Sequence, residues 1–237
     1  MKKFFLFAVI ALSAFATRAQ TADEILDKHF TAIGGADKWK KMESLRMVGT
    51  GTAQGMEFSV TTTKARPNKA RVESDMMGQN VVMSCYDGTT CWSKTPWGTM
   101  GKPTKMGEAE QKAAQSESFD GDLIDYKTKG STVTLIGKDS VEGAKCFKLS
   151  LKKASGDEKF YYVNAKTYLI DMVQAISTRG PNKGMSETLL SDYKDVNGLK
   201  MPYSIETKMK GETVFNLKFD TIEVDPKIDA TVFVFPK

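Results

Sequence analysis

The chain has 237 residues and a modest basic excess, with 34 Lys and Arg against 29 Asp and Glu and a formal net charge of +5. No cluster of Lys and Arg interleaved with aromatic residues occurs, which argues against nucleic acid as a partner. The single His, His29, leaves no second imidazole for nucleophilic or metal chemistry. No Gly-rich phosphate loop or zinc-type Cys spacing is present. We therefore expect no catalytic residue, no cofactor and no metal site, and no enzyme activity.

Residues 1–19 are typical of a secretory signal peptide. Lys2 and Lys3 precede an apolar run from Phe4 to Phe15, and small residues lead up to Ala19. The run is shorter than the roughly 20 residues that a membrane-spanning helix needs. We expect cleavage after Ala19, which lowers the net charge to +2 and leaves one domain over 20–237, free in solution.

Two helices are predicted at the start of the mature chain. Thr21 and Glu24 form the Ser/Thr-x-x-Glu capping box, and apolar residues then recur at helical spacing until Gly34-Gly35. A shorter helix is expected from Ala36 to Met42, with Trp39 on it. Both helices should bury their apolar stripes against a sheet.

From Leu45 onward the pattern changes to the period of two that is typical of strands. Short turns such as Asp87-Gly88 and Asn197-Gly198 favour hairpins and an antiparallel meander. Since about a dozen consecutive strands must curl, we predict a mainly β, α+β fold: an unclosed antiparallel half-barrel. The predicted strands are 45–52, 55–65, 69–75, 79–86, 90–94, 131–138, 144–152, 158–163, 168–176, 185–194, 201–209 and 212–220.

One segment interrupts the meander. Gly107 to Phe119 is rich in Glu, Gln and Ala without alternation, which predicts a helix inserted between strands as a lid over one end of the sheet. The acidic group Asp120, Asp122 and Asp125 that follows is more typical of a turn than of a catalytic pair or a metal site.

Cys85 and Cys91 flank the turn signal Tyr86-Asp87-Gly88-Thr89. A three-residue loop would place the two cysteines opposite each other and permit a disulfide, whereas a two-residue turn would not. Export would make the oxidation chemically permissible. Cys146 is expected to be a free thiol.

The apolar residues of the first strands are candidates for a ligand groove. Alternation places Met56, Phe58 and Val60 on one inward-facing side of their strand. Thioether side chains adapt to several apolar shapes, so methionines can line such a groove, although filling gaps in a core is the alternative for each one. The candidate groove residues are Phe58, Val60, Met76, Met83, Trp92 and Trp97.

Several short motifs along the chain carry a family resemblance. They are Arg66-Pro67-Asn68, Arg71-Val72-Glu73, Tyr86-Asp87-Gly88, Trp92 with Pro96, and the closing Phe233-Val234-Phe235-Pro236. With the leading and inserted helices, these motifs resemble the outer-membrane lipoprotein-sorting family, the LolA-like periplasmic carriers. Two later stretches, Tyr193 to Leu199 and Met201-Pro202-Tyr203, are similar to the versions found in Bacteroidetes.

The resemblance implies a half-barrel with a helical lid, whose apolar cavity accepts the acyl chains of a lipoprotein that crosses the periplasm. In that family an Arg just before a Pro hydrogen-bonds the lid backbone and holds the cavity closed, and Arg66 matches its position. The five donors of a guanidinium also suit the free carbonyls at helix ends. A surface Arg that fixes a strand end is the alternative. Ala70 stands where the family has an aromatic residue.

The predicted function is that of a monomeric periplasmic carrier or chaperone for lipoprotein acyl chains or another lipid. Its expected partners are this lipid cargo and membrane proteins of the inner and outer membranes. The alternative is a lipid- or lipoprotein-sensing interaction module that regulates an envelope complex without transport. A third hypothesis, a hydrolase of unfamiliar type, would have His29 as its only imidazole.

Overall fold

A computed structural model describes residues 20–76, 78–177 and 184–236 of the chain. The predicted signal peptide at 1–19 lies outside these residues. The helices are α1 (Ala22–Ala32), α2 (Ala36–Lys41) and α3 (Glu108–Ser116), and a 3-10 helix, η1 (Ala230–Phe233), precedes the C-terminus. None of the helices in the described part of the chain is long and apolar enough to span a membrane.

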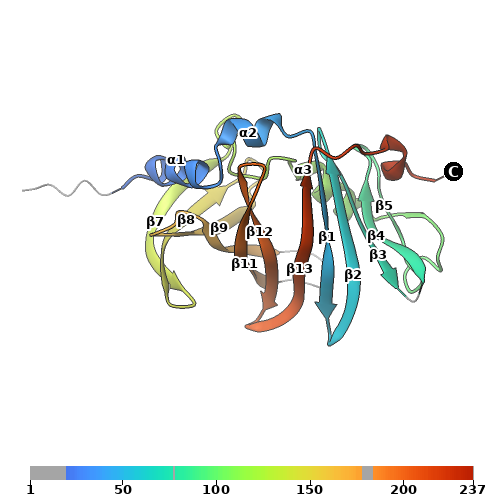
Figure 1. Cartoon of the computed structure of the whole chain (residues 1–237). Coiled ribbons are helices and arrows are strands. Elements are labelled where there is room, and N and C mark those ends of the chain that lie inside the picture. Colours follow the sequence, from blue (N-terminus) through green and yellow to red (C-terminus); the bar gives the residue numbers. More distant parts are fainter. Residues whose placement is uncertain (1–19, 77, 178–183, 237) are drawn as a thin grey trace, which may run out of the picture.

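The strands form one antiparallel sheet in the order β6-β5-β4-β3-β2-β1-β13-β12-β11-β10-β9-β8-β7 (Figure 1). The predicted half-barrel is confirmed, since β6 and β7 end the sheet without pairing with each other. Twelve strands match the predicted ones, and the sequence missed only the two-residue β6. The bounds are β1 Ser44–Ala53, β2 Met56–Ala65, β3 Lys69–Met76, β4 Gln79–Tyr86, β5 Cys91–Lys94, β6 Thr104–Lys105, β7 Thr132–Val141, β8 Ala144–Lys152, β9 Glu158–Asn164, β10 Ile170–Ser177, β11 Gly184–Val196, β12 Leu199–Met209 and β13 Glu212–Val224.

The first helix begins and ends as its sequence predicts. The Thr21 hydroxyl accepts from the Glu24 amide at 3.2 Å, and the Glu24 carboxylate accepts from the Thr21 amide at 3.0 Å. After the helix, Gly34 has φ +100°, and a Cβ there would lie 2.1 Å from the Gly198 carbonyl oxygen. Only Gly permits this close approach, which brings the end of α1 onto the β11–β12 turn.

The helices cover one end of the strands, with α1 and α2 along the upper edge in Figure 1 and α3 behind β1 and β13. Below α1, Ile25 and Leu26 are fully buried in a core with residues of β8, β9 and β10. A second core, beside α2, fills the neighbouring part of the concave face. Its buried residues are Met42, Leu45, Val60, Phe119, Leu199, Met201, Phe219 and Ile222.

The C-terminal segment packs on the opposite face of the sheet. Phe233 is buried there against Val82, Cys85 and Trp92. The Arg71 guanidinium donates to the Val232 carbonyl oxygen at 2.9 Å and pairs with Glu73. The segment therefore covers the convex side of β3, β4 and β5.

The join between β1 and β13 depends on Gly49. The register shifts between Val48 and Gly49, and a Cβ at Gly49 would lie 2.0 Å from the Lys218 carbonyl oxygen. We predict that Gly49→Ala lowers the free energy of unfolding by about 1 to 3 kcal/mol, because backbone atoms cannot yield as a flexible side chain can. Urea unfolding measures this, with the exposed Thr52→Ala in the same strand as the control. Equal stability of the two variants would contradict the prediction.

Candidate apolar ligand site

An apolar pocket of about 500 Å³ opens near the hairpin end of the sheet. Its walls come from the β1–β2 hairpin, the β3–β4 hairpin, the loop after β5 and the start of β13. The lining residues are Ala53, Gln54, Met56, Glu57, Phe58, Asp75, Met76, Met83, Trp97 and Phe215. This volume lies within the range of known small-molecule sites.

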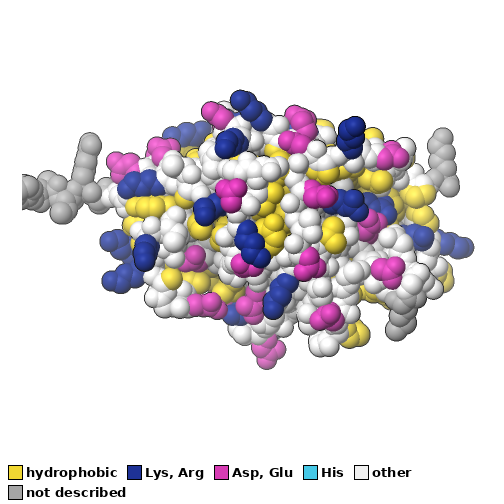
Figure 2. All heavy atoms as spheres, in the orientation of Figure 1, with side chains coloured by type: hydrophobic (Ala, Val, Ile, Leu, Met, Phe, Trp, Pro, Cys, Tyr) yellow, Lys and Arg dark blue, Asp and Glu magenta, His cyan; other side chains and the backbone are white. Residues whose placement is uncertain are grey.

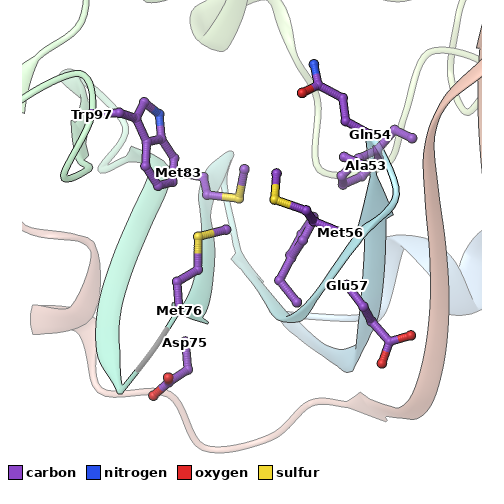
Figure 3. Close-up of a pocket in the computed structure, with 10 residues that line it drawn as sticks. Ala53, Gln54, Met56, Glu57, Asp75, Met76, Met83 and Trp97 are labelled. Atoms are coloured by element: carbon purple, nitrogen blue, oxygen red, sulfur yellow. The ribbon is translucent and has the colours of Figure 1, made fainter.

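Thioether and aromatic side chains make the interior of the pocket. Figure 3 shows Met56, Met76 and Met83 converging from different strands, with the Trp97 indole beside Met83. The carboxylates of Glu57 and Asp75 point away from these methionines in the same view. The pocket therefore offers a flexible apolar surface, with its charges at the margin.

Phe58 is placed by the absence of a side chain on the neighbouring strand. Gly51 lies opposite Phe58, and a Cβ on Gly51 would come within 2.5 Å of the Phe58 ring. The ring rests over this strand and meets Phe215 of β13, with 5.9 Å between the ring centroids. Gly51 thus provides the space that lets two aromatic rings form one wall of the pocket.

Four of the six predicted groove residues line this pocket: Phe58, Met76, Met83 and Trp97. Val60 faces the same side but is 1% exposed within the packed core beside α2. Trp92 lies on the convex face, where its indole N–H donates to the Phe233 carbonyl oxygen at 3.0 Å. The placement of Val60 and Trp92 in the groove is therefore wrong.

Some lining residues were not named from the sequence. Phe215 shares a face with Leu217 and Phe219, and this alternation along β13 was a usable signal. Gln54 and Ala53 lie at the tip of a hairpin, where no periodic pattern marks a ligand wall.

Arg66 links two of the elements that cover the sheet. Its Nε donates to the Met42 carbonyl oxygen at 2.7 Å, and Nη2 donates to the Trp39 carbonyl oxygen at 3.0 Å. These carbonyls belong to the end of α2, so the guanidinium caps this helix. The same guanidinium holds both oxygens of Asp120, at 2.5 and 3.0 Å.

The predicted acidic turn is a set of ion pairs. We call residues 117–131 the covering segment, because Phe119, Leu123 and Tyr126 of this stretch are buried against the cores. Asp120 pairs with Arg66, and Asp125 pairs with Lys40 of α2. Asp122 lies 2.7 Å from both Lys153 and Lys159. Each carboxylate thus fastens the segment to a different part of the molecule.

Asp122 is the most enclosed of these carboxylates. Burial alone would raise its pKa, but hydrogen bonds from Lys153 and Lys159 lower it below the ordinary value. It lines a second, polar cavity of about 480 Å³ together with Lys129 and several serines. The apolar pocket and this cavity thus differ in chemistry.

The two hairpin cysteines are not opposite each other. Tyr86 pairs with Cys91, and Cys85 pairs with Trp92, so the connecting loop has four residues, 87–90. The one-residue offset places Cys85 and Cys91 on opposite faces of the sheet. All three cysteines, including Cys146, are free thiols in this structure. The predicted disulfide geometry is therefore wrong, because the Asp87 carboxylate accepts from the amides of Thr89 and Thr90 and lengthens the turn.

His29 is a buried residue of α1. The Tyr168 carbonyl oxygen accepts a hydrogen bond from its Nδ1 at 2.8 Å, which fixes the proton on that nitrogen. Burial lowers the pKa of His29, so the ring is neutral at pH 7. His29 is thus a buried core side chain whose Nδ1 has a hydrogen-bond partner.

Comparison with known proteins identifies the fold. No family model matches the chain, and no curated protein matches it. A DUF1329 family protein from Desulfovibrio piger superposes with a TM-score of 0.58 at 12% identity, over 89% of this chain and 97% of that one. A LolA superfamily protein from Nitrosomonas europaea gives 0.55 at 14% identity, over 91% and 98%. An outer membrane lipoprotein-sorting protein domain from Vibrio parahaemolyticus gives 0.57 at 8% identity, over 89% and 94%. The chain therefore has the LolA-like fold.

The face of the molecule in Figure 2 carries charges of both signs, interspersed over the strands and the helices. No single-sign patch of the kind that binds a phosphate backbone dominates this face.

The contacts of Arg66 predict that it holds α2 and the covering segment together. Arg66→Leu should leave the sheet intact but speed amide hydrogen exchange in α2 and residues 117–131. A double-mutant cycle with Asp120→Ala should give a coupling free energy of about 1 kcal/mol or more. Arg71→Leu is the matched control, since Arg71 contacts the C-terminal segment instead. Unchanged amide exchange in both α2 and residues 117–131 of Arg66→Leu would contradict the prediction that Arg66 holds them together.

The burial of His29 predicts a pH-dependent stability. As the pH falls from about 7.5 to about 5.5, the unfolded chain takes up the His proton before the folded chain does, so the free energy of unfolding decreases. The slope should not exceed about 1.4 kcal/mol per pH unit for one proton. In His29→Gln the dependence over this range should disappear, because no other side chain has its ordinary pKa there. Denaturant titrations at four pH values test this, and equal slopes for both proteins would refute it.

Proposed function

We propose that the mature chain is a periplasmic carrier or chaperone that holds the acyl chains of a lipoprotein, or of another lipid, in the apolar pocket. The observation that carries this proposal is the pocket itself, with its three methionines and three aromatic rings. The LolA-like fold supports it, since one similar structure is named for lipoprotein sorting. Membership of the LolA-like sorting family, in the version found in Bacteroidetes, and export by the signal peptide are parts of the same proposal.

The proposed activity is binding without bond chemistry. Each methylene moved from water into an apolar environment contributes about 0.8 kcal/mol, so affinity should rise with chain length until the pocket is full. Methionine side chains can adjust to saturated and unsaturated chains alike. Partner proteins at the inner and outer membranes would load and unload a monomeric carrier.

A second function is favoured by one observation, the packed core beside α2. That core fills the concave face next to α2, and the apolar pocket lies at the hairpin end. A lipid- or lipoprotein-sensing module that regulates an envelope complex needs only such a small site. Transfer separates the two functions: a carrier delivers bound lipid to acceptor vesicles, whereas a sensor retains it.

Met83→Asp is predicted to weaken acyl-chain binding at least about tenfold, since a carboxylate in the pocket would be desolvated by the ligand. Met185→Asp is the matched control, because Met185 is 51% exposed and lies outside the pocket. Titration of the delipidated proteins with fatty acids of increasing length measures the effect. Native mass spectrometry of protein from a periplasmic extract would identify the bound lipid. Absence of binding by the parent protein to fatty acid, phospholipid and lipopeptide would overturn the proposed function.

A further inference from the structure

Large apolar side chains are exposed around the mouth of the pocket. Met56 is 66% exposed, Trp97 is 63% exposed, and Met100 is 85% exposed. Met56 and Trp97 line the pocket from opposite walls, and Met100 follows three residues after Trp97 in the same loop. Single exposed apolar residues are common on protein surfaces, but a group at the entrance of an apolar pocket indicates an interaction surface.

Hydrogen bonds within the loop define the backbone conformation around Trp97 and Met100. The Thr95 carbonyl oxygen accepts from the amides of Thr99 and Gly101, and the Thr95 hydroxyl accepts from the Gly98 amide. The Thr99 hydroxyl in turn accepts from the Thr95 amide at 2.8 Å. Met100 has φ +51° at the tip of this turn. The hydrogen-bonded backbone of the loop therefore places the side chains of Trp97 and Met100 in solvent.

The charged residues nearest to this loop in the sequence are basic. Between Asp87 and Glu108 the sequence contains Lys94, Lys102 and Lys105 and no acidic residue. Lys102 and Lys105 are exposed, and Lys94 is half-buried. The nearest carboxylates of the pocket, Glu57 and Asp75, belong to the two hairpins and point away from the methionines in Figure 3.

We propose that residues 95–103, together with the β1–β2 hairpin at Met56, dock onto the surface of an anionic phospholipid bilayer. Trp is enriched at the membrane interface, and lysines beside an apolar anchor are attracted to anionic headgroups. Trp and Met are also enriched at protein–protein interfaces, but Lys is depleted there, so the lysines beside this loop favour the bilayer. Docking by this rim would turn the mouth of the pocket toward the lipid. The inference goes beyond the proposed function, since it assigns a docking surface to the rim of the pocket and a partner for that surface.

The test uses the mature chain, residues 20–237, and vesicles of phosphatidylethanolamine with phosphatidylglycerol, compared with vesicles of phosphatidylcholine. Co-sedimentation should show binding to the anionic vesicles that weakens as salt is added. Met100→Asp and Lys102→Glu should each reduce this binding at least about tenfold, and neither residue lines the pocket. Ile136→Asp is the matched control and should bind like the parent, because Ile136 is 57% exposed on β7, far along the sheet order from β5.

The results separate this inference from the proposed function. Met83→Asp should bind vesicles like the parent but bind fatty acid more weakly. Met100→Asp should bind fatty acid like the parent but bind vesicles more weakly. Equal loss in Ile136→Asp, equal binding to phosphatidylcholine, or no binding to any vesicle would overturn the docking proposal. Capture of an envelope protein by residues 95–103 without vesicle binding would also overturn it, in favour of a protein partner.

Discussion

The concave face of the curled sheet must be kept from water, and this constraint organises the molecule. Thirteen antiparallel strands form the curved sheet, and α1, α2 and the covering segment pack over part of its concave face. Near the helices, the strands and Phe119 close the space with a packed core. Toward the hairpin tips none of the helices in the described residues covers the sheet, and there part of the inner face forms the apolar pocket. The site therefore lies in a part of the concave face that the packed cores leave open.

Ion pairs as well as apolar contacts join the covering segment to the rest of the molecule. The covering segment has little regular structure, so ordering it costs conformational entropy that a few buried side chains must offset. Asp120, Asp122 and Asp125 each meet a cation from a different element. A guanidinium with five donors can also satisfy the carbonyls at the end of α2, which is why Arg, rather than Lys, suits position 66.

Alternation and turn chemistry predicted most of the architecture. The strands, the capping box at Thr21 and the inward side of Phe58 follow from local patterns, whereas the expectation that Arg66 contacts a helix end came from the family resemblance. The face of Trp92 and the partner of Cys85 did not follow, because both depend on the four-residue loop 87–90, whose length is set by the hydrogen bonds of the Asp87 carboxylate. The sequence also could not predict that Arg66 pairs with Asp120. The two residues are 54 positions apart, and their contact depends on the path of the covering segment over the concave face.

Within the half-barrel, the pairing of β1 with β13 joins the two ends of the described chain at the middle of the sheet. All the other pairings link neighbours in sequence, so they can form early, whereas this one must wait for the last strand and its loop-closure entropy. Phe58 of β2 and Phe215 of β13 come into contact only when β1 and β13 have paired. A nascent or truncated chain without its last strand would therefore lack one wall of the pocket, which is complete only once β13 has paired with β1.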